Sequence, residues 1–461
     1  MARVAAMRPG LFAALVVLAA PGMAWSQTAA EACAVHVQRL AEPLGRLDGW
    51  RLSRGHAAAT ADRDGPHPPF DPAAHIARLT TLCADKALGA NVWDDVGAVL
   101  LAAGETDAAL AVAEDQVRLR PTRAARSQLA VARLRKGDQE GALKAWPFKA
   151  GAGVTQDRLL SAIYYTLLLD IDDKARPETT RVAEAVWRKV IADDGLPGDV
   201  GGLASILIGE GLILEAQGQP AAAGRTYGRA AALSDLIKSD LIKPTAPSER
   251  RVLESLIVEA HTFEVRALVQ AGDRQAATKA SREMLRRMDE QLFVPAGGVA
   301  GYAASTPGRS HSSVLNLTAR YGDIARDLIE AGAAAQAVAV MRGAVEIDDA
   351  FAKDSGRRDG EIRILLAKAL RLNGASGEAL QAVDQGLALL GARQPLDREL
   401  AVQGGLERGE ILTALKAPAA QACDAYRQAL TLAEPTDDQA DVAAMMKALD
   451  ARLAEPRCRA S

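Results

Sequence analysis

The residues best suited to chemistry lie close together near the N-terminus, in a segment rich in glycine, proline and aspartate. Between residues 56 and 75 this segment carries three histidines and three aspartates, which are His56, Asp62, Asp64, His67, Asp71 and His75. Imidazole nitrogens and carboxylate oxygens bind Zn²⁺ and other divalent ions, so a metal site would form if the segment folded back on itself. Because the spacing matches no established type of metal site, we interpret the segment as a solvated loop and predict no metal and no cofactor.

Catalytic and nucleotide-binding motifs are absent from the sequence. None of the six histidines belongs to an HExxH motif, no serine stands in GxSxG, and neither GxxxxGK[ST] nor CxxC occurs. The glycines Gly297, Gly298 and Gly301 follow no predicted strand and precede no lysine, as a phosphate cradle would require. We therefore expect a protein that is not an enzyme. An exported enzyme or metal-binding protein that uses the 56–75 segment is the alternative.

The first 26 residues have the order of a secretory signal. Arg3 and Arg8 precede the apolar run Leu11–Ala20, and small residues follow up to a predicted cleavage site after Ser26. The apolar run is about half as long as the roughly 20 residues that a membrane-spanning helix needs. We expect a periplasmic or secreted protein with no stable membrane insertion after cleavage.

Charge excludes another class of partner. The chain has 55 Lys and Arg against 58 Asp and Glu, a net charge of -3, so no basic excess would attract nucleic acid. Apolar residues make up 49% and charged residues 25%, which is the composition of a folded soluble protein. We predict no nucleic-acid binding.

The predicted export would allow the four cysteines to form disulfides, because disulfides persist in an oxidising compartment. Cys33 and Cys83 lie near one end of the chain, and Cys423 and Cys458 near the other. We favour pairing within each end, where each bond would contribute on the order of 4 kcal/mol by closing a loop. Two other connectivities and four unpaired thiols are the alternatives.

A helical repeat is visible along the chain, and its first clear unit spans residues 90 to 121. It carries a Gly104 turn, a small Ala109, a terminal Pro121 and a first helix with Trp93, Val96, Gly97 and Leu100. This arrangement resembles the tetratricopeptide pattern W-x2-L-G-x2-Y…A-x3-F…P. Small residues let two antiparallel helices approach closely, and proline stops the second helix.

Seven further units repeat the small residue of the second helix. With the first unit, the anchors are Ala109, Ala142, Ala183, Ala223, Ala277, Ala337, Ala379 and Ala422. The pattern predicts an all-α fold, a right-handed α-solenoid of about eight helical hairpins over residues 90–435. Helical caps are expected at both ends, over residues 27–89 and 436–461. The 293–313 segment shows no helical period and is predicted to be the longest interior loop. A divergent α-solenoid of another kind and a plain helical bundle are the alternatives.

Resemblance to tetratricopeptide proteins implies a non-catalytic scaffold or adaptor that binds a protein or peptide in a concave groove formed by the first helices. Three units place Arg266, Arg326 and Lys368 one residue after the small position of the first helix, and Arg371 follows Lys368 by one turn. Such a row of cations would favour an acidic segment or a C-terminal carboxylate. Ordinary exposed charge is the alternative, and the Lys/Asn set of carboxylate-clamp members of the family is missing.

Overall fold

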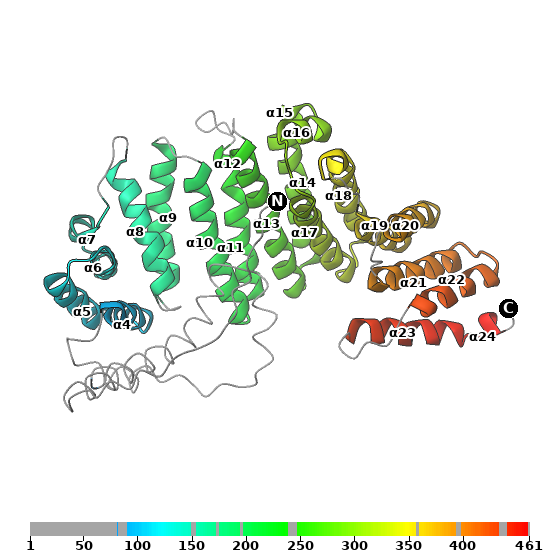
Figure 1. Ribbon diagram of the computed structural model, residues 1–461, viewed down its shortest axis with the longest axis horizontal. Helices are drawn as coiled ribbons and strands as arrows, with labels where there is room; N and C mark the ends of the chain where they lie inside the picture. Colours follow the sequence, from blue (N-terminus) through cyan, green and yellow to red (C-terminus); the bar gives the residue numbers. More distant parts are fainter. Residues whose placement is uncertain are drawn as a thin grey trace, which may run out of the picture. The chain divides into compact units, whose positions relative to one another are not determined.

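The computed structural model describes residues 81, 90–148, 154–171, 175–193, 197–237, 247–355, 359–392, 398–432 and 440–459. Within these ranges every regular element is a helix and no strand occurs, which confirms the all-α prediction. The helices belong to two compact units, with α4 to α7 in the first and most of α8 to α24 in the second (Figure 1). No helix in this part of the chain is both long and apolar enough to cross a membrane.

Two helical hairpins form the described part of the first unit. They are α4 (Ala90–Ala102) with α5 (Thr106–Leu119), and α6 (Arg123–Arg135) with α7 (Gln139–Ala145). Gly104 and Gly137 turn the chain inside each hairpin with φ angles of 81° and 84°, which glycine adopts at little steric cost. The predicted small positions Ala109 and Ala142 are buried where the paired helices meet.

Six further helix pairs make up most of the second unit. They are α8 (Gln156–Asp170) with α9 (Arg176–Ala192), α10 (Pro197–Ala216) with α11 (Pro220–Ala232), α13 (Pro247–Gln270) with α14 (Arg274–Met288), α17 (His311–Glu330) with α18 (Ala334–Ser355), α19 (Gly360–Leu372) with α20 (Ser376–Gly391), and α21 (Arg398–Ala414) with α22 (Ala419–Leu432). A short helix, α12 (Ser234–Ile237), follows α11. In all eight pairs of the described part, the predicted small anchor lies on the second helix.

Neighbouring hairpins of the second unit stack in chain order. The first helix of each hairpin contacts the first helix of the next, from α10 through α13, α17 and α19 to α21. We call these five first helices the first-helix row. Second helices α11, α18 and α20 also contact the first helix that follows them. Contacts that join each hairpin mainly to its neighbours define a solenoid, so the predicted α-solenoid is confirmed in the second unit, and the two units together hold the eight predicted hairpins.

Glycine lets two of these hairpins close tightly. A Cβ atom added to Gly211 of α10 would lie 2.3 Å from Cε1 of Tyr227, on the facing helix α11. In the last hairpin, a Cβ atom on Gly409 of α21 would lie 2.1 Å from the same atom of Tyr426 on α22. Both tyrosines are fully buried. A large ring therefore fills the space that a glycine leaves at the same place in each hairpin.

The prediction of an interior loop at residues 293–313 is wrong, because much of this segment is helical. After α14 the chain continues through η2 (Asp289–Phe293), α15 (Val294–Ala296) and α16 (Val299–Ser305). Gly297 and Gly298 break the helices with φ angles of 83° and 99°. Val299, Tyr302 and Ala303 nevertheless share one face of α16 and are buried. This face spans too few residues, between too many glycines, to give a recognisable period.

A buried ion pair attaches this segment to α13. Glu254 of α13 accepts hydrogen bonds from the Tyr302 hydroxyl at 2.8 Å and from Nη1 of Arg309 at 2.6 Å. The Arg309 guanidinium also lies 5.1 Å from the ring centroid of Phe351 on α18. Burial raises the pKa of Tyr302, and the Glu254 charge raises it further. These contacts explain how the chain spans the long interval between α14 and α17 without leaving an open loop.

Candidate partner-binding site

The predicted cations lie on the first-helix row, but the three arginines do not stand free. Arg266 of α13 pairs with Glu215 of α10, and Arg326 of α17 pairs with Glu361 of α19. Arg371 of α19 donates a hydrogen bond from Nη2 to Oε2 of Glu407 on α21, at a distance of 3.1 Å. Each pair joins one hairpin to the next, so most of the predicted basic charge is offset by carboxylates. We call these three pairs the inter-hairpin ion pairs.

Arg266 is half-buried and held by several contacts. Its guanidinium donates two hydrogen bonds to Glu215, 2.8 Å from Nη2 and 3.3 Å from Nε, and lies 4.8 Å from the ring centroid of Phe263. Glu215 also accepts a hydrogen bond from the Tyr227 hydroxyl at 2.7 Å. Nearby, burial raises the pKa of Asp327 to about 6, although the Arg266 charge acts in the opposite direction. This end of the row is an internal network rather than an open cationic surface.

Lys368 differs from the three arginines. It is half-buried on α19 and makes no ion pair with any residue in the described part of the chain. It lies one turn beyond Leu365 on the same helix, and helical side chains lean toward the helix N-terminus. Of the four predicted cations, Lys368 is the one whose charge is available to a ligand.

A hollow of about 150 Å³ lies between α17 and α19, at the side of Leu365. Leu315, Ala319 and Gly322 of α17 line it on one side, and Ile362 and Leu365 of α19 on the other. A Cβ atom on Gly322 would lie 3.6 Å from Leu365, so the missing side chain leaves space instead of allowing close helix packing. The hollow is therefore a small, mostly apolar depression in the first-helix row.

Charged and polar groups surround this hollow. Arg326 and Glu361 pair across it, and Arg326 also donates to Asp323 at 3.0 Å. Asn316 is exposed at the rim, and Asp359 caps α19 by accepting from the Glu361 amide at 3.0 Å. An apolar floor with polar groups at its edge is the usual form of a site that binds a side chain of a partner.

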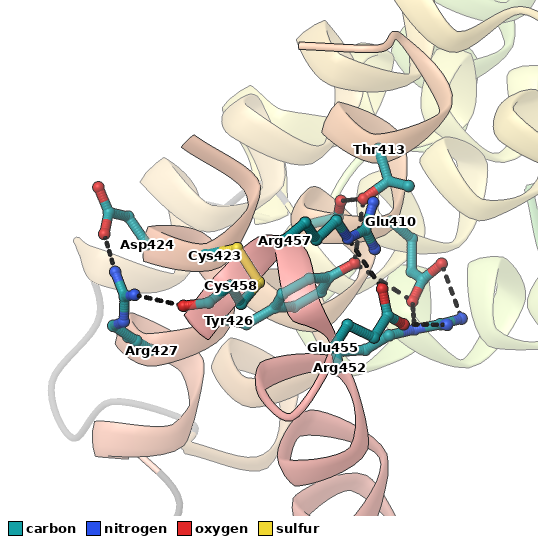
Figure 2. Close-up of a disulfide and its surroundings, with 11 residues drawn as sticks. Glu410, Thr413, Cys423, Asp424, Tyr426, Arg427, Arg452, Glu455, Arg457 and Cys458 are labelled. Carbon is teal, nitrogen blue, oxygen red and sulfur yellow. Dashed lines mark hydrogen bonds and ion pairs between the residues drawn. A yellow bond between two sulfur atoms is a disulfide. The ribbon is translucent and has the colours of Figure 1, made fainter. Parts of the chain in front are cut away.

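The C-terminal helices close the other end of the first-helix row. Helix α23 (Ala440–Leu453) packs on α21 and α22, and α24 (Pro456–Arg459) packs on α22. Figure 2 shows the predicted disulfide between Cys423 of α22 and Cys458 of α24, which the structure confirms. Both cysteines are buried, and Arg427 donates to the Cys458 carbonyl at 3.3 Å.

A further ion pair strengthens this closure. Arg452 of α23 donates to Glu410 of α21 at 2.6 Å and to Glu455 at 2.9 Å (Figure 2). The hydrogen bonds that Arg452 donates to Glu455 and Glu410 raise the pKa of its guanidinium. Glu410 occupies the register of the predicted cations in the last hairpin, so α23 binds the final first helix much as one hairpin binds the next.

No family model and no curated protein matches the sequence. Among solved structures, the chain is similar to the TPR domain of P58(IPK), with 16% identity over 79% of this chain and 98% of the other, at a TM-score of 0.22. The chain is also similar to yeast Tom70, with 10% identity over 84% of this chain and 94% of the other, at a TM-score of 0.22. For the APC/C hetero-tetramer Cut9-Hcn1 the identity is 12%, over 84% of this chain and 91% of the other, and the TM-score is again 0.22.

The chain resembles tetratricopeptide-repeat proteins. At these scores the likeness adds nothing to what the hairpins, their buried small residues and their stacking already establish about the fold. It says nothing of the partner of this tetratricopeptide-like array.

Several predicted residues lie outside the described part of the chain. They include Cys33 and Cys83, the signal at residues 1–26, and the His and Asp residues of the 56–75 segment. Among the described residues, no three histidine, cysteine or acidic side chains form a group that would hold a metal ion. The metal-binding alternative and the Cys33–Cys83 bond therefore stay predictions.

The sequence reasoning missed the carboxylates that face the predicted cations. Arg326 and Glu361 are 35 residues apart, and Arg371 and Glu407 are 36 apart, close to the length of one hairpin. Opposite charges separated by one repeat were the signal that could have revealed these pairs. The hollow had a weaker signal, the small residues Ala319 and Gly322 one turn apart on the same face of α17.

Proposed function

We propose that this protein is a non-catalytic scaffold that binds an extended segment of a partner protein on the first-helix row. The observation that carries the proposal is the hollow between α17 and α19, with its apolar lining and polar rim. The inter-hairpin ion pairs support it as well, because they hold neighbouring first helices in register on both sides of the hollow. A surface prepared in this way loses little conformational freedom when a partner binds.

We also propose that the scaffold acts outside the cytoplasm, in the periplasm or as a secreted protein. Two observations support this location. The first 26 residues have the order of a secretory signal, and the Cys423–Cys458 disulfide suits an oxidising compartment. Intact mass of the protein from its native host tests the proposal. Loss of residues 1–26 is expected, and a mass that includes Met1 would contradict it.

Site-specific crosslinking tests the scaffold proposal directly. A photo-reactive amino acid at Ala319, which is exposed and lines the hollow, is expected to crosslink a partner protein in the native host. The matched control carries the same group at Ala339, which is exposed on the second helix α18. Adducts at 339 but none at 319 would show that binding occurs elsewhere. The absence of adducts at both positions and along the rest of the first-helix row would contradict a scaffold function.

A further inference from the structure

We propose that the hollow between α17 and α19 takes one aliphatic side chain of the partner, and that Lys368 binds an acidic residue close to it in the partner's sequence. This inference rests on the proposed scaffold function and specifies the partner by its chemistry. It narrows the predicted basic row to one cation with a neighbouring apolar anchor site. The two halves of the inference rest on different observations, the size of the hollow and the pairing of the charges.

The size and lining of the hollow favour a single apolar side chain. An apolar cavity of roughly 150 Å³ holds one benzene-sized group, which is close to the bulk of a leucine or isoleucine side chain. The floor is formed by Leu315, Ile362 and Leu365, while Ala319 and Gly322 supply the space. Few polar groups reach the floor, so a polar side chain would lose its hydration there without gaining hydrogen bonds.

The distribution of charge favours an acidic neighbour on one side only. Asp359 and Glu361 lie at the N-terminal end of α19, where a carboxylate of the partner would be repelled. Arg326 does not reverse this, because it pairs with Glu361 and Asp323. Toward the C-terminal end of α19 lies Lys368, whose charge no carboxylate of the described chain offsets. An acidic residue is therefore expected beyond the aliphatic side chain, in the direction in which α19 runs.

Peptide selection tests both halves of the inference. A library of random linear peptides displayed on phage is selected on the full chain, and the enriched peptides are synthesised with a fluorescent label. We expect an aliphatic residue with an aspartate or glutamate close to it, on the same side of it in all enriched peptides. Replacing the aliphatic residue by alanine is expected to weaken binding at least about tenfold, as for other buried side chains that lose several methylene groups.

Two variants connect this preference to the site. Ala319→Leu places a leucine of the protein itself at an exposed position on the rim of the hollow, and leucine is a good helix former, so the fold is retained. It is expected to abolish the aliphatic preference, whereas Ala339→Leu on α18 leaves it unchanged. Lys368→Glu is expected to replace the acidic preference by a basic one. Circular dichroism of each variant verifies that the helices are intact.

Three results would overturn the inference: no enrichment of aliphatic residues, an aliphatic preference that Ala319→Leu leaves intact, or an acidic preference that survives Lys368→Glu. None of these would by itself refute the scaffold function, because the crosslinking at position 319 uses the native partner and no library. Crosslinks at 319 together with an unchanged preference in Ala319→Leu would mean that the partner passes over the hollow without entering it.

Discussion

The junction of α17 with α19 and the junction of α21 with α23 share the same kind of ion pair, but only the first keeps a hollow. In each, a helix packs on the first helix before it and an arginine pairs with a glutamate across the contact, Arg326 with Glu361 and Arg452 with Glu410. Small residues leave a hollow of about 150 Å³ in the first junction. In the second, Leu449 of α23 is fully buried in the apolar cluster of the last hairpin. One junction keeps a hollow, and the other is closed by the chain itself.

Under the proposed function, this difference in side-chain size would decide which first helix receives the partner. The C-terminal helices occupy the place of a next hairpin and are fastened to the array by the disulfide. Without them, the apolar cluster around Tyr426 would be exposed at the end of the solenoid, where arrays are prone to fray. We therefore expect the α17–α19 junction to respond to ligands, and the α21–α23 junction to respond to changes in the cap.

Removal of the disulfide has the largest expected effect. The double variant Cys423→Ser with Cys458→Ser is expected to lose about 4 kcal/mol of local stability in α22 to α24, because the bond restricts the unfolded chain over a separation of 35 residues. Hydrogen exchange resolved by segment measures this loss. Wild-type protein under reducing conditions serves as the control and should match the variant. Equal protection with and without the bond would contradict a fastened cap, and so would a loss confined to α17 and α19.

Matched glycine substitutions separate the open junction from tightly packed positions. Gly409→Ala would drive a Cβ atom into the Tyr426 ring and is expected to destabilise its hairpin by about 1 to 3 kcal/mol. Gly322→Ala meets only ordinary contacts, so the better helix former is expected to stabilise α17 by up to about 1 kcal/mol. Thermal unfolding compares the two variants with wild type. Equal destabilisation by both would mean that no space exists beside Gly322.

A smaller effect, of pH on the stability of the folded chain, is expected at Asp327 of α17, near Arg266 of α13. Because burial raises the pKa of Asp327 from 3.8 to about 6, its ionised form destabilises the folded chain above pH 6, and this penalty disappears as the pH falls toward 4. Asp327→Asn removes the charge and is expected to raise stability near pH 8 by about 1 kcal/mol, with little effect near pH 3.5. Arg266, Asp323, Glu330 and Arg326 are the charged groups that influence this carboxyl. Thermal unfolding across this pH range measures it, and a gain that is equal at both ends would rule out titration as its cause.

The repeating part of the fold could be predicted from the sequence, because small anchors recur in every hairpin and turn glycines recur in six of the eight described hairpins. Ala109 and Ala422 illustrate this, since each lies buried on a second helix as expected. The 293–313 segment could not be predicted in this way. Its order depends on Glu254, about 50 residues earlier in the chain, which binds Tyr302 and Arg309. A local periodicity carries no information about such a distant partner.

The candidate site could be predicted only in part. The register placed Arg266, Arg326, Lys368 and Arg371 on the first helices, where the structure has them. Whether these cations are free or paired could not be predicted, because the carboxylates that offset the arginines come from neighbouring hairpins. The hollow was also hidden, since it is defined by side chains that are absent at Ala319 and Gly322.

Hydrogen exchange of the free and partner-bound protein tests the central claim most directly, because it reports on the open and the closed junction in one experiment. The partner is the protein captured by crosslinking at position 319, or failing that the tightest selected peptide. We predict slower exchange in α17 and α19 on binding, with α21 to α23 unchanged. Protection confined to α21 to α23, or to helices outside the first-helix row, would contradict the assignment of the α17–α19 hollow as the binding site.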